Sequence, residues 1–186
     1  MDTLHRAAEA YGKLVNMNAE VTLSNGYAFL LCFRAGNFHH LAGIQKLKDL
    51  IFHKDKDWFF NRAYKGVITE DTLRKSVFFL DHCNERLFDL CHINELIQVG
   101  THVVYPFDSK AAHSSLRSDV ILFSPDGFSG YLSLACAKSP VSPVHVPPFY
   151  YPESFFSTNT DRNFRGQRKL IIQDVVLRHQ HTGRSE

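Results

Sequence analysis

The chain has 186 residues, of which 44% are apolar and 22% are charged, and its formal net charge is +2. This length suits one compact domain with a sizeable core, and the apolar content excludes a disordered chain. The small net charge excludes nucleic-acid recognition by bulk charge, so any such function must depend on local clusters of cations.

Two features of the composition bear on the cellular compartment. No run approaches the ~20 apolar residues that a membrane-spanning helix needs. The four cysteines lack the CxxC spacing of zinc sites and lie in apolar contexts that favour buried thiols over disulfides. We therefore expect a cytoplasmic protein with no membrane partner.

The first hundred residues are expected to be mainly helical. Residues 3–16 predict a helix, and residues 20–33 predict a hairpin about Ser24-Asn25-Gly26. Asn37 is a plausible N-cap for a helix that runs to about residue 52. A further helix begins near Thr69, and residues 84–99 carry an amphipathic stripe.

After Gly100 the signals change to those of strands. Segments 101–105, 119–123, 130–137 and 169–179 are rich in Val, Ile, Leu and Tyr. The proline-rich segment 139–153 predicts a fixed loop or an edge strand. The expected fold class is α+β, with N-terminal helices packed on a small C-terminal antiparallel β-sheet. We expect a single domain over 1–186, with the helices and an N-terminal hairpin at about 1–100, the sheet at about 101–180 and a polar tail at 181–186.

Two adjacent histidines lie near the start of the predicted helix that begins at Asn37. On a helical wheel His40 falls within the apolar half, whereas His39 lies on a ridge with Gly43 and Lys46. Gly43 leaves a notch where another backbone or a ligand phosphate can approach. His40 can be a core histidine that is hydrogen-bonded to a carbonyl, or a general acid or base for phosphoryl chemistry.

The segment 150–170 combines aromatic rings, hydroxyl groups and the arginines Arg162, Arg165 and Arg168. In one groove these groups would suit single-stranded nucleic acid. The arginines can equally be a solvated loop, and the phenylalanines can be core. Neither a GxSxG nor an HExxH motif is present, so we expect chemistry that uses no metal and no cofactor.

Several separated strings resemble one family. NFHHLAGIQKLKD, the Lys75-Ser76 pair, SSLRSDVILF, GYLSLACA and YYPESFF followed by Gln167 occur in an order and spacing similar to the phage-associated branch of the barnase, EndoU, colicin and RelE-like (BECR) nucleases. The resemblance covers about residues 20–178. It implies a BECR-type fold, with a helical N-terminal part followed by a small antiparallel sheet.

The resemblance also implies a function and a set of residues. The expected activity is a metal-independent endoribonuclease, typically a toxin of a phage, mobile-element or toxin–antitoxin system. Its partners would be cellular RNA, such as tRNA or mRNA, and a protein or RNA antitoxin. The alternative is a non-catalytic RNA-binding or protein-interaction module on the same fold. The predicted catalytic residues are His39, His40, Lys46, Glu153 and Ser154, and the predicted substrate-binding residues are Lys48, Arg162, Arg165, Gln167 and Arg168.

Overall fold

We describe the fold from a computed structural model of the chain, for residues 2–52, 55–116, 118–125, 131–139 and 147–180. The predicted tail at 181–186 and residues 140–146 of the proline-rich segment lie outside the described residues. The helical elements are α1 (Thr3–Gly12), α2 (Ala35–Leu41), η1 (Ile44–Lys46), α3 (Lys56–Tyr64), α4 (Glu70–Leu73), η2 (Leu80–Asn84), α5 (Glu85–Leu90) and η3 (Ile93–Leu96). The strands are β1 (Met17–Leu23), β2 (Ala28–Cys32), β3 (His102–Val104), β4 (Val120–Pro125), β5 (Tyr131–Lys138), β6 (Phe149–Thr158) and β7 (Lys169–His179).

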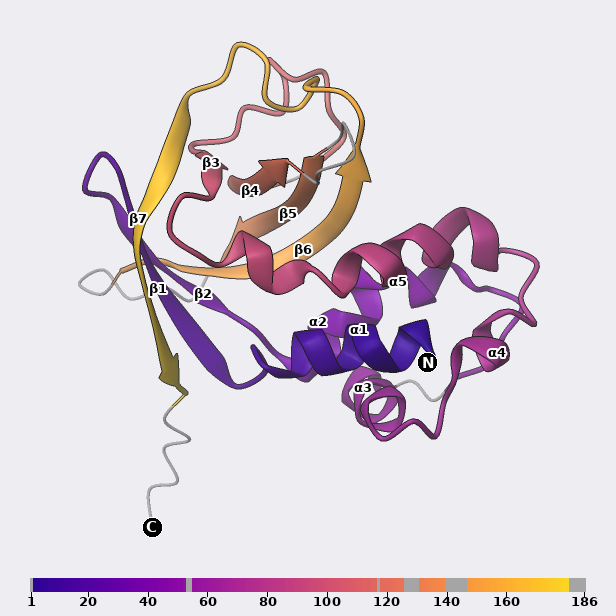
Figure 1. Ribbon diagram of the computed structural model, residues 1–186. Helices are drawn as coiled ribbons and strands as arrows, with labels where there is room; N and C mark the ends of the chain where they lie inside the picture. The colour runs from indigo at the N-terminus through magenta and orange to yellow at the C-terminus, as the bar shows by residue number, and fades with distance from the viewer. Residues whose placement is uncertain (1, 53–54, 117, 126–130, 140–146, 181–186) are drawn as a thin grey trace.

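The strands form a closed barrel in the order β1-β2-β6-β5-β4-β3-β7. Strand β7 closes it, because its first residues pair with β3 and the remainder pairs with β1, from Leu23 opposite Ile172 to Met17 opposite His179. Figure 1 shows β7 running beside β1 along one side of the molecule, so that the chain's last strand lies next to its first.

The predicted architecture of N-terminal helices on a small C-terminal antiparallel sheet is therefore wrong. The hairpin β1–β2 and strand β7 form where their patterns predict them, but β1 and β2 join the later strands in one barrel. Strand β6 is part of the barrel wall and not an edge strand. It pairs with β5 on one side and, in parallel, with β2 on the other. It accommodates Pro152 beside a register shift in the ladder, where a missing N–H donor is tolerated.

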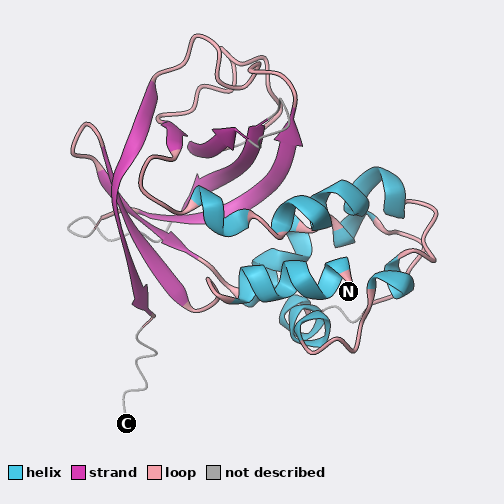
Figure 2. Cartoon of the chain, viewed as in Figure 1, coloured by secondary structure: helices cyan, strands magenta, loops and turns pink. Residues whose placement is uncertain are grey.

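The helices gather beside the barrel in a layer of their own (Figure 2). Helices α2 and α5 pack on β6, and η3 packs on β4 and β5. One continuous core joins the two layers, with helical residues such as Tyr11, Phe38 and Leu87 buried together with strand residues such as Val21 and Leu134. No helix in the described part of the chain is long and apolar enough to cross a membrane.

The predicted long helix from Asn37 is wrong beyond residue 41. Helix α2 stops there because Gly43 adopts a positive φ of 77°, a left-handed conformation that only glycine adopts without strain. The chain then turns into the short 3₁₀ segment η1. The apolar residues after Gly43 therefore belong to a different segment from the histidines, although the sequence pattern runs through both.

A second, smaller core lies under two loops, 105–116 and 159–168. Phe164 from the later loop stacks on Phe123 of β4, with ring centroids 4.1 Å apart. Phe107 and Ala112 from the earlier loop join the same cluster. The loop that carries the predicted arginines is thus fixed to the barrel by its buried phenylalanine.

Candidate active site

Helix α2 brings both histidines into its last turn. The helix begins after Arg34, whose backbone N–H donates to Asn37 Oδ1 at 3.1 Å. At the other end, the N–H of Gly43 donates to the carbonyl of His40 at 3.0 Å. Phe38 and Leu41 turn into the core, and this fixes the directions of the two imidazole rings between them.

His39 is the partly buried histidine of the pair. Its ring stands perpendicular to that of Phe59 on α3, with centroids 5.3 Å apart. Its Nδ1 is buried and has no hydrogen-bond partner among the described residues. Burial, assisted by the charges of Lys56 and His40, lowers the pKa of His39 to about 4. The ring is therefore neutral near pH 7 and mainly serves the packing of α2 on α3.

His40 is exposed, so the prediction that it faces inward is wrong. The helical wheel included apolar residues beyond Gly43, and these do not continue α2. With the shorter helix, the core side is set by Phe38, Leu41 and Ala42. The interpretation of His40 as a core histidine is excluded by this exposure. His40 instead presents its ring at the surface, at a point where cations gather.

Three cations act on His40. Partial desolvation and the charges of Lys56, Arg86 and Lys46 all lower its pKa from the ordinary value. Lys56 begins α3, Arg86 lies in α5 and Lys46 ends η1, so separate elements bring the charges together. One carboxylate also approaches this helix, because Asp57 Oδ1 lies beside Gly36, one turn before His40. The imidazole is neutral near pH 7 and can accept a proton.

Arg86 is a partly buried guanidinium without a carboxylate partner among the described residues. Its Cδ lies 3.3 Å from the point where a Cβ of Gly43 would stand, and desolvation lowers its pKa. The sequence predicts that another backbone or a ligand phosphate can approach the notch at Gly43. In the structure a backbone group, the carbonyl of His82, occupies it. A desolvated, unpaired guanidinium beside a neutral histidine is a suitable site for a phosphate.

A groove opens next to this cluster, at the start of α2. Strands β2 and β6 pair at only two positions, Leu30 with Phe149 and Leu31 with Tyr150, after which β2 ends and the chain leads into α2. The groove has a volume of about 720 Å³. It is lined by Asn18, Cys32, Arg34, Asn37, Ser139, Phe149, Tyr150, Tyr151 and Gln180. Asn37 lines it and lies one helical turn before His40, so groove and cluster are neighbours.

Glu153 and Ser154 lie on β6, the strand on which α2 packs. Asn37 Nδ2 donates to the carbonyl of Pro152 at 3.4 Å, directly before Glu153. Glu153 accepts a hydrogen bond from Ser118 Oγ at 3.3 Å, and its charge helps to raise the pKa of buried Cys136. Ser154 pairs with Ala135 in the ladder. Glu153 thus follows the residue that Asn37 contacts, although neither Glu153 nor Ser154 lines the groove.

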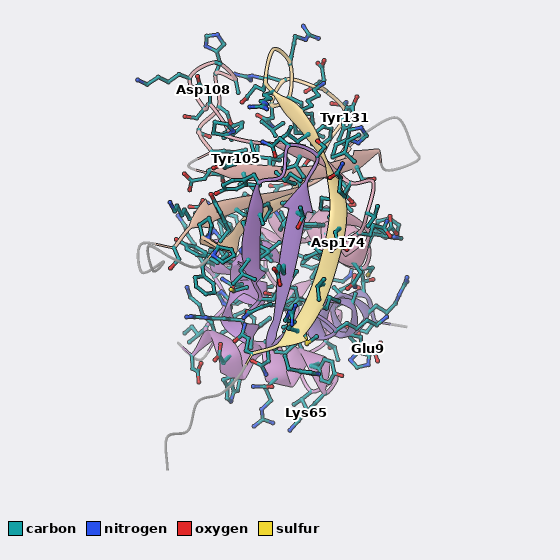
Figure 3. All side chains as sticks on the ribbon, turned by 90° about the vertical axis from the view of Figure 1, so that its left-hand side faces the viewer. Glu9, Lys65, Tyr105, Asp108, Tyr131 and Asp174 are labelled. Carbon is teal, nitrogen blue, oxygen red and sulfur yellow. The ribbon has the colours of Figure 1, made fainter. Side chains whose placement is uncertain are left out.

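The remaining predicted residues are placed elsewhere. Gln167 Oε1 accepts from the backbone N–H of Asp108 at 2.8 Å. Figure 3 shows Asp108 at the opposite end of the molecule from Lys65, which caps α3. Arg162 donates to the carbonyl of His113, and Arg165 pairs with Asp161 at 2.9 Å. Arg168 is exposed in the same loop. These residues do not join the histidines of α2 in one cleft.

Near the histidines, Lys46 belongs to the cluster because its charge lowers the pKa of His40. Lys48, two residues later, is also exposed but is not among the charges that act on His40. Lys56 and Arg86 are the members of the cluster that sequence reasoning missed. Arg86 lies next to Leu87 in an amphipathic pattern. Nothing in that pattern indicates that Arg86 lies near α2, which is more than forty residues earlier in the chain. No group of three or more His, Cys, Asp or Glu side chains in the described ranges is arranged to hold a metal ion.

Comparison with known proteins gives one family. Residues 3–171 match the model of the family described as phage-Barnase-EndoU-ColicinE5/D-RelE like nuclease4. No curated protein and no solved structure matches the chain. Because the match spans most of the 186 residues, the chain belongs to the phage-Barnase-EndoU-ColicinE5/D-RelE like nuclease4 family.

Proposed function

We propose that this nuclease is an endoribonuclease that cleaves cellular RNA by attack of the ribose 2′-hydroxyl on the adjacent phosphate. The observation that carries the proposal is the environment of His40: an exposed imidazole, neutral near pH 7, whose pKa is lowered by partial desolvation and by the charges of Lys56, Arg86 and Lys46. A base and several cations around one point are what this transesterification requires, and here the chain itself supplies the positive charge. No metal ion takes part in the proposed step.

Each group has a defined part in the reaction. His40 accepts the proton of the 2′-hydroxyl, and the new O2′–P bond forms as the P–O5′ bond breaks. Arg86 binds the phosphate oxygens that gain charge, because its guanidinium is partly desolvated. The leaving 5′ oxygen takes a proton from the ammonium group of Lys46. The products are a 2′,3′-cyclic phosphate and a 5′-hydroxyl end.

The test compares RNA cleavage by the wild-type chain and two histidine variants. His40→Ala should slow cleavage about 10²- to 10⁴-fold, the usual contribution of a general base. His92→Ala is the matched control, because His92 is another exposed histidine of the helical layer, and its ion-pair partner is Glu95, at 2.8 Å. Equal rates for His40→Ala and wild type would contradict the role of His40. RNA binding without cleavage by the wild type would favour a non-catalytic RNA-binding module.

The proposal includes a biological role as a toxin that a cognate antitoxin, protein or RNA, neutralises. The phage association in the family's description supports this role. Expression of the chain should arrest bacterial growth, and His40→Ala should relieve the arrest at equal protein level. Growth arrest that persists in the His40→Ala variant would separate toxicity from cleavage and would contradict the role.

A further inference from the structure

We propose that the groove between β2 and β6 binds one nucleotide of the RNA substrate and prefers adenine as its base. The inference rests on the proposed ribonuclease function and adds a base-selecting subsite to it. The volume of the groove, about 720 Å³, lies within the range of small-molecule sites. The groove adjoins the His40 cluster through Asn37, so a bound nucleotide would place its phosphate toward α2.

Arg34 supplies the positive charge of the groove. Its side chain is exposed at the start of α2, and the described residues give it no ion-pair partner. The guanidinium is close enough to Cys32 on the groove floor that its charge opposes the rise in the pKa of that thiol caused by burial. An unpaired guanidinium over a groove attracts a phosphate group, which it can bind with two hydrogen bonds.

Tyr151 supplies a surface for stacking. It lies on β6 at the wall of the groove, and 38% of its surface is exposed. No ring among the described residues stacks on it, in contrast to Tyr27, which stacks on Tyr105 with centroids 4.3 Å apart. Exposed aromatic rings beside a cation are the usual platform for an unpaired RNA base.

Asn18 supplies the group that reads the edge of the base. It pairs with Cys32 in the β1–β2 ladder and lines the groove. Its Oδ1 is buried and has no hydrogen-bond partner among the described residues. The neighbouring Gln180 amide is already used, since its Nε2 donates to the carbonyl of Met17 at 3.3 Å. The protein thus leaves the oxygen of the Asn18 carboxamide buried and unsatisfied beside the groove.

On the Hoogsteen edge of the base, adenine is the one that satisfies such a carboxamide, because guanine presents two acceptors there and the pyrimidines lack the second ring nitrogen. The exocyclic amino group of adenine donates to the amide oxygen, while the adjacent ring nitrogen accepts from the amide N–H. A rotation of the Asn18 side chain turns its oxygen into the groove, and the new hydrogen bond removes the cost of a buried, unpaired acceptor. Arg34, Tyr151 and Asn18 would therefore hold the phosphate, the ring and the edge of one nucleotide.

The test measures binding of 3′-AMP, 3′-GMP, 3′-CMP and 3′-UMP to the intact chain by NMR titration. Wild type should bind 3′-AMP most tightly, with shifts at the groove residues. Tyr151→Leu should weaken 3′-AMP binding at least about fivefold, the loss expected for one stacked base. Tyr151→Phe should bind like wild type because it keeps the ring. Tyr64→Leu is the matched control, since Tyr64 is also an exposed tyrosine but lies on α3.

A substitution at Asn18 separates base selection from stacking. Asn18→Leu should bring the affinities for the four nucleotides to within about twofold of one another, because the edge-reading amide is gone. The inference is overturned if 3′-AMP shifts no groove residue, if Tyr151→Leu binds as tightly as Tyr151→Phe, or if wild type shows no preference for 3′-AMP. Because binding is measured without cleavage, RNA cleavage that depends on His40 would still support the proposed function in each of these cases.

Discussion

The backbone of Gly43 lies directly against the carbonyl of His82, so close that a Cβ on Gly43 would collide with it. This contact brings the end of α2, with His40, next to the η2–α5 segment, with Arg86. The proposed base and the proposed phosphate-binding guanidinium are thus adjacent because a glycine lies at this one position.

Substitution of Gly43 by alanine should destabilise the fold. We expect Gly43→Ala to lower the free energy of unfolding by about 2–4 kcal/mol, from the positive φ and the collision together. Gly100→Ala is the matched control: its φ is 92°, but nothing lies within 4 Å of its added Cβ. It should cost about 1 kcal/mol. Urea denaturation measures both variants. Equal decreases in the free energy of unfolding would show that the collision with the His82 carbonyl contributes nothing.

The pH dependence of cleavage should follow His40. Its pKa is lowered, so the neutral form persists to below pH 6.5, and cleavage should be lost only as the pH falls through that lowered pKa. Lys56→Met removes a charge that lowers the pKa and should move the acidic limb of the rate profile to higher pH. Lys65→Met, at the far end of α3, should leave the midpoint unchanged. A midpoint that does not move in Lys56→Met would contradict the assignment of His40 as the base.

His39 should make the fold sensitive to acid. Its pKa is about 4 when folded and 6.5 ordinarily, so between these values the unfolded chain binds a proton that the folded chain does not. The free energy of unfolding should therefore fall as the pH drops from about 6.5 to about 4, by roughly 1–3 kcal/mol. His39→Phe should remove most of this loss, whereas His92→Ala should retain it. Denaturation curves at several pH values measure the free energy of unfolding of both variants. If it falls with pH in His39→Phe as steeply as in the wild type, the acid sensitivity does not come from His39.

The arginines of the 159–168 loop should matter for long RNA only. They lie at the other end of the barrel from α2, so a dinucleotide bound at His40 cannot reach them. We expect Arg162→Met and Arg165→Met to leave dinucleotide cleavage unchanged and to raise the KM for long RNA, more so at low salt. Slower cleavage of the dinucleotide would place these arginines at the reacting phosphate and contradict the separation described above.

Local patterns in the sequence were sufficient for several elements. The hairpin about Asn25 and Gly26 and the strand at residues 169–179 form because alternation and turn residues act over a few positions. The pairing of β7 with β1 and the position of β6 depend on contacts between distant segments. Such contacts leave no signal in a single sequence, and the architecture was mispredicted for that reason.

The same difference between local patterns and contacts between distant segments applies to the candidate site. The sequence placed the histidine pair, Lys46 and the notch at Gly43 close together, because all of them lie within a few residues of one another. It did not show that Gly43 ends α2, and this error exchanged the orientations of His39 and His40. Arg86 and Lys56 come from other elements, so only the packing of α5 and α3 reveals them.

The most direct test of the proposed activity is the chemistry of the RNA ends formed in the presence of EDTA. Purified wild-type chain should produce 2′,3′-cyclic phosphate and 5′-hydroxyl ends at an undiminished rate, and the His40→Ala variant should produce almost none. Ends that carry a 5′-phosphate and a 3′-hydroxyl, or cleavage that stops in EDTA, would contradict 2′-hydroxyl attack assisted by His40 and the cations around it.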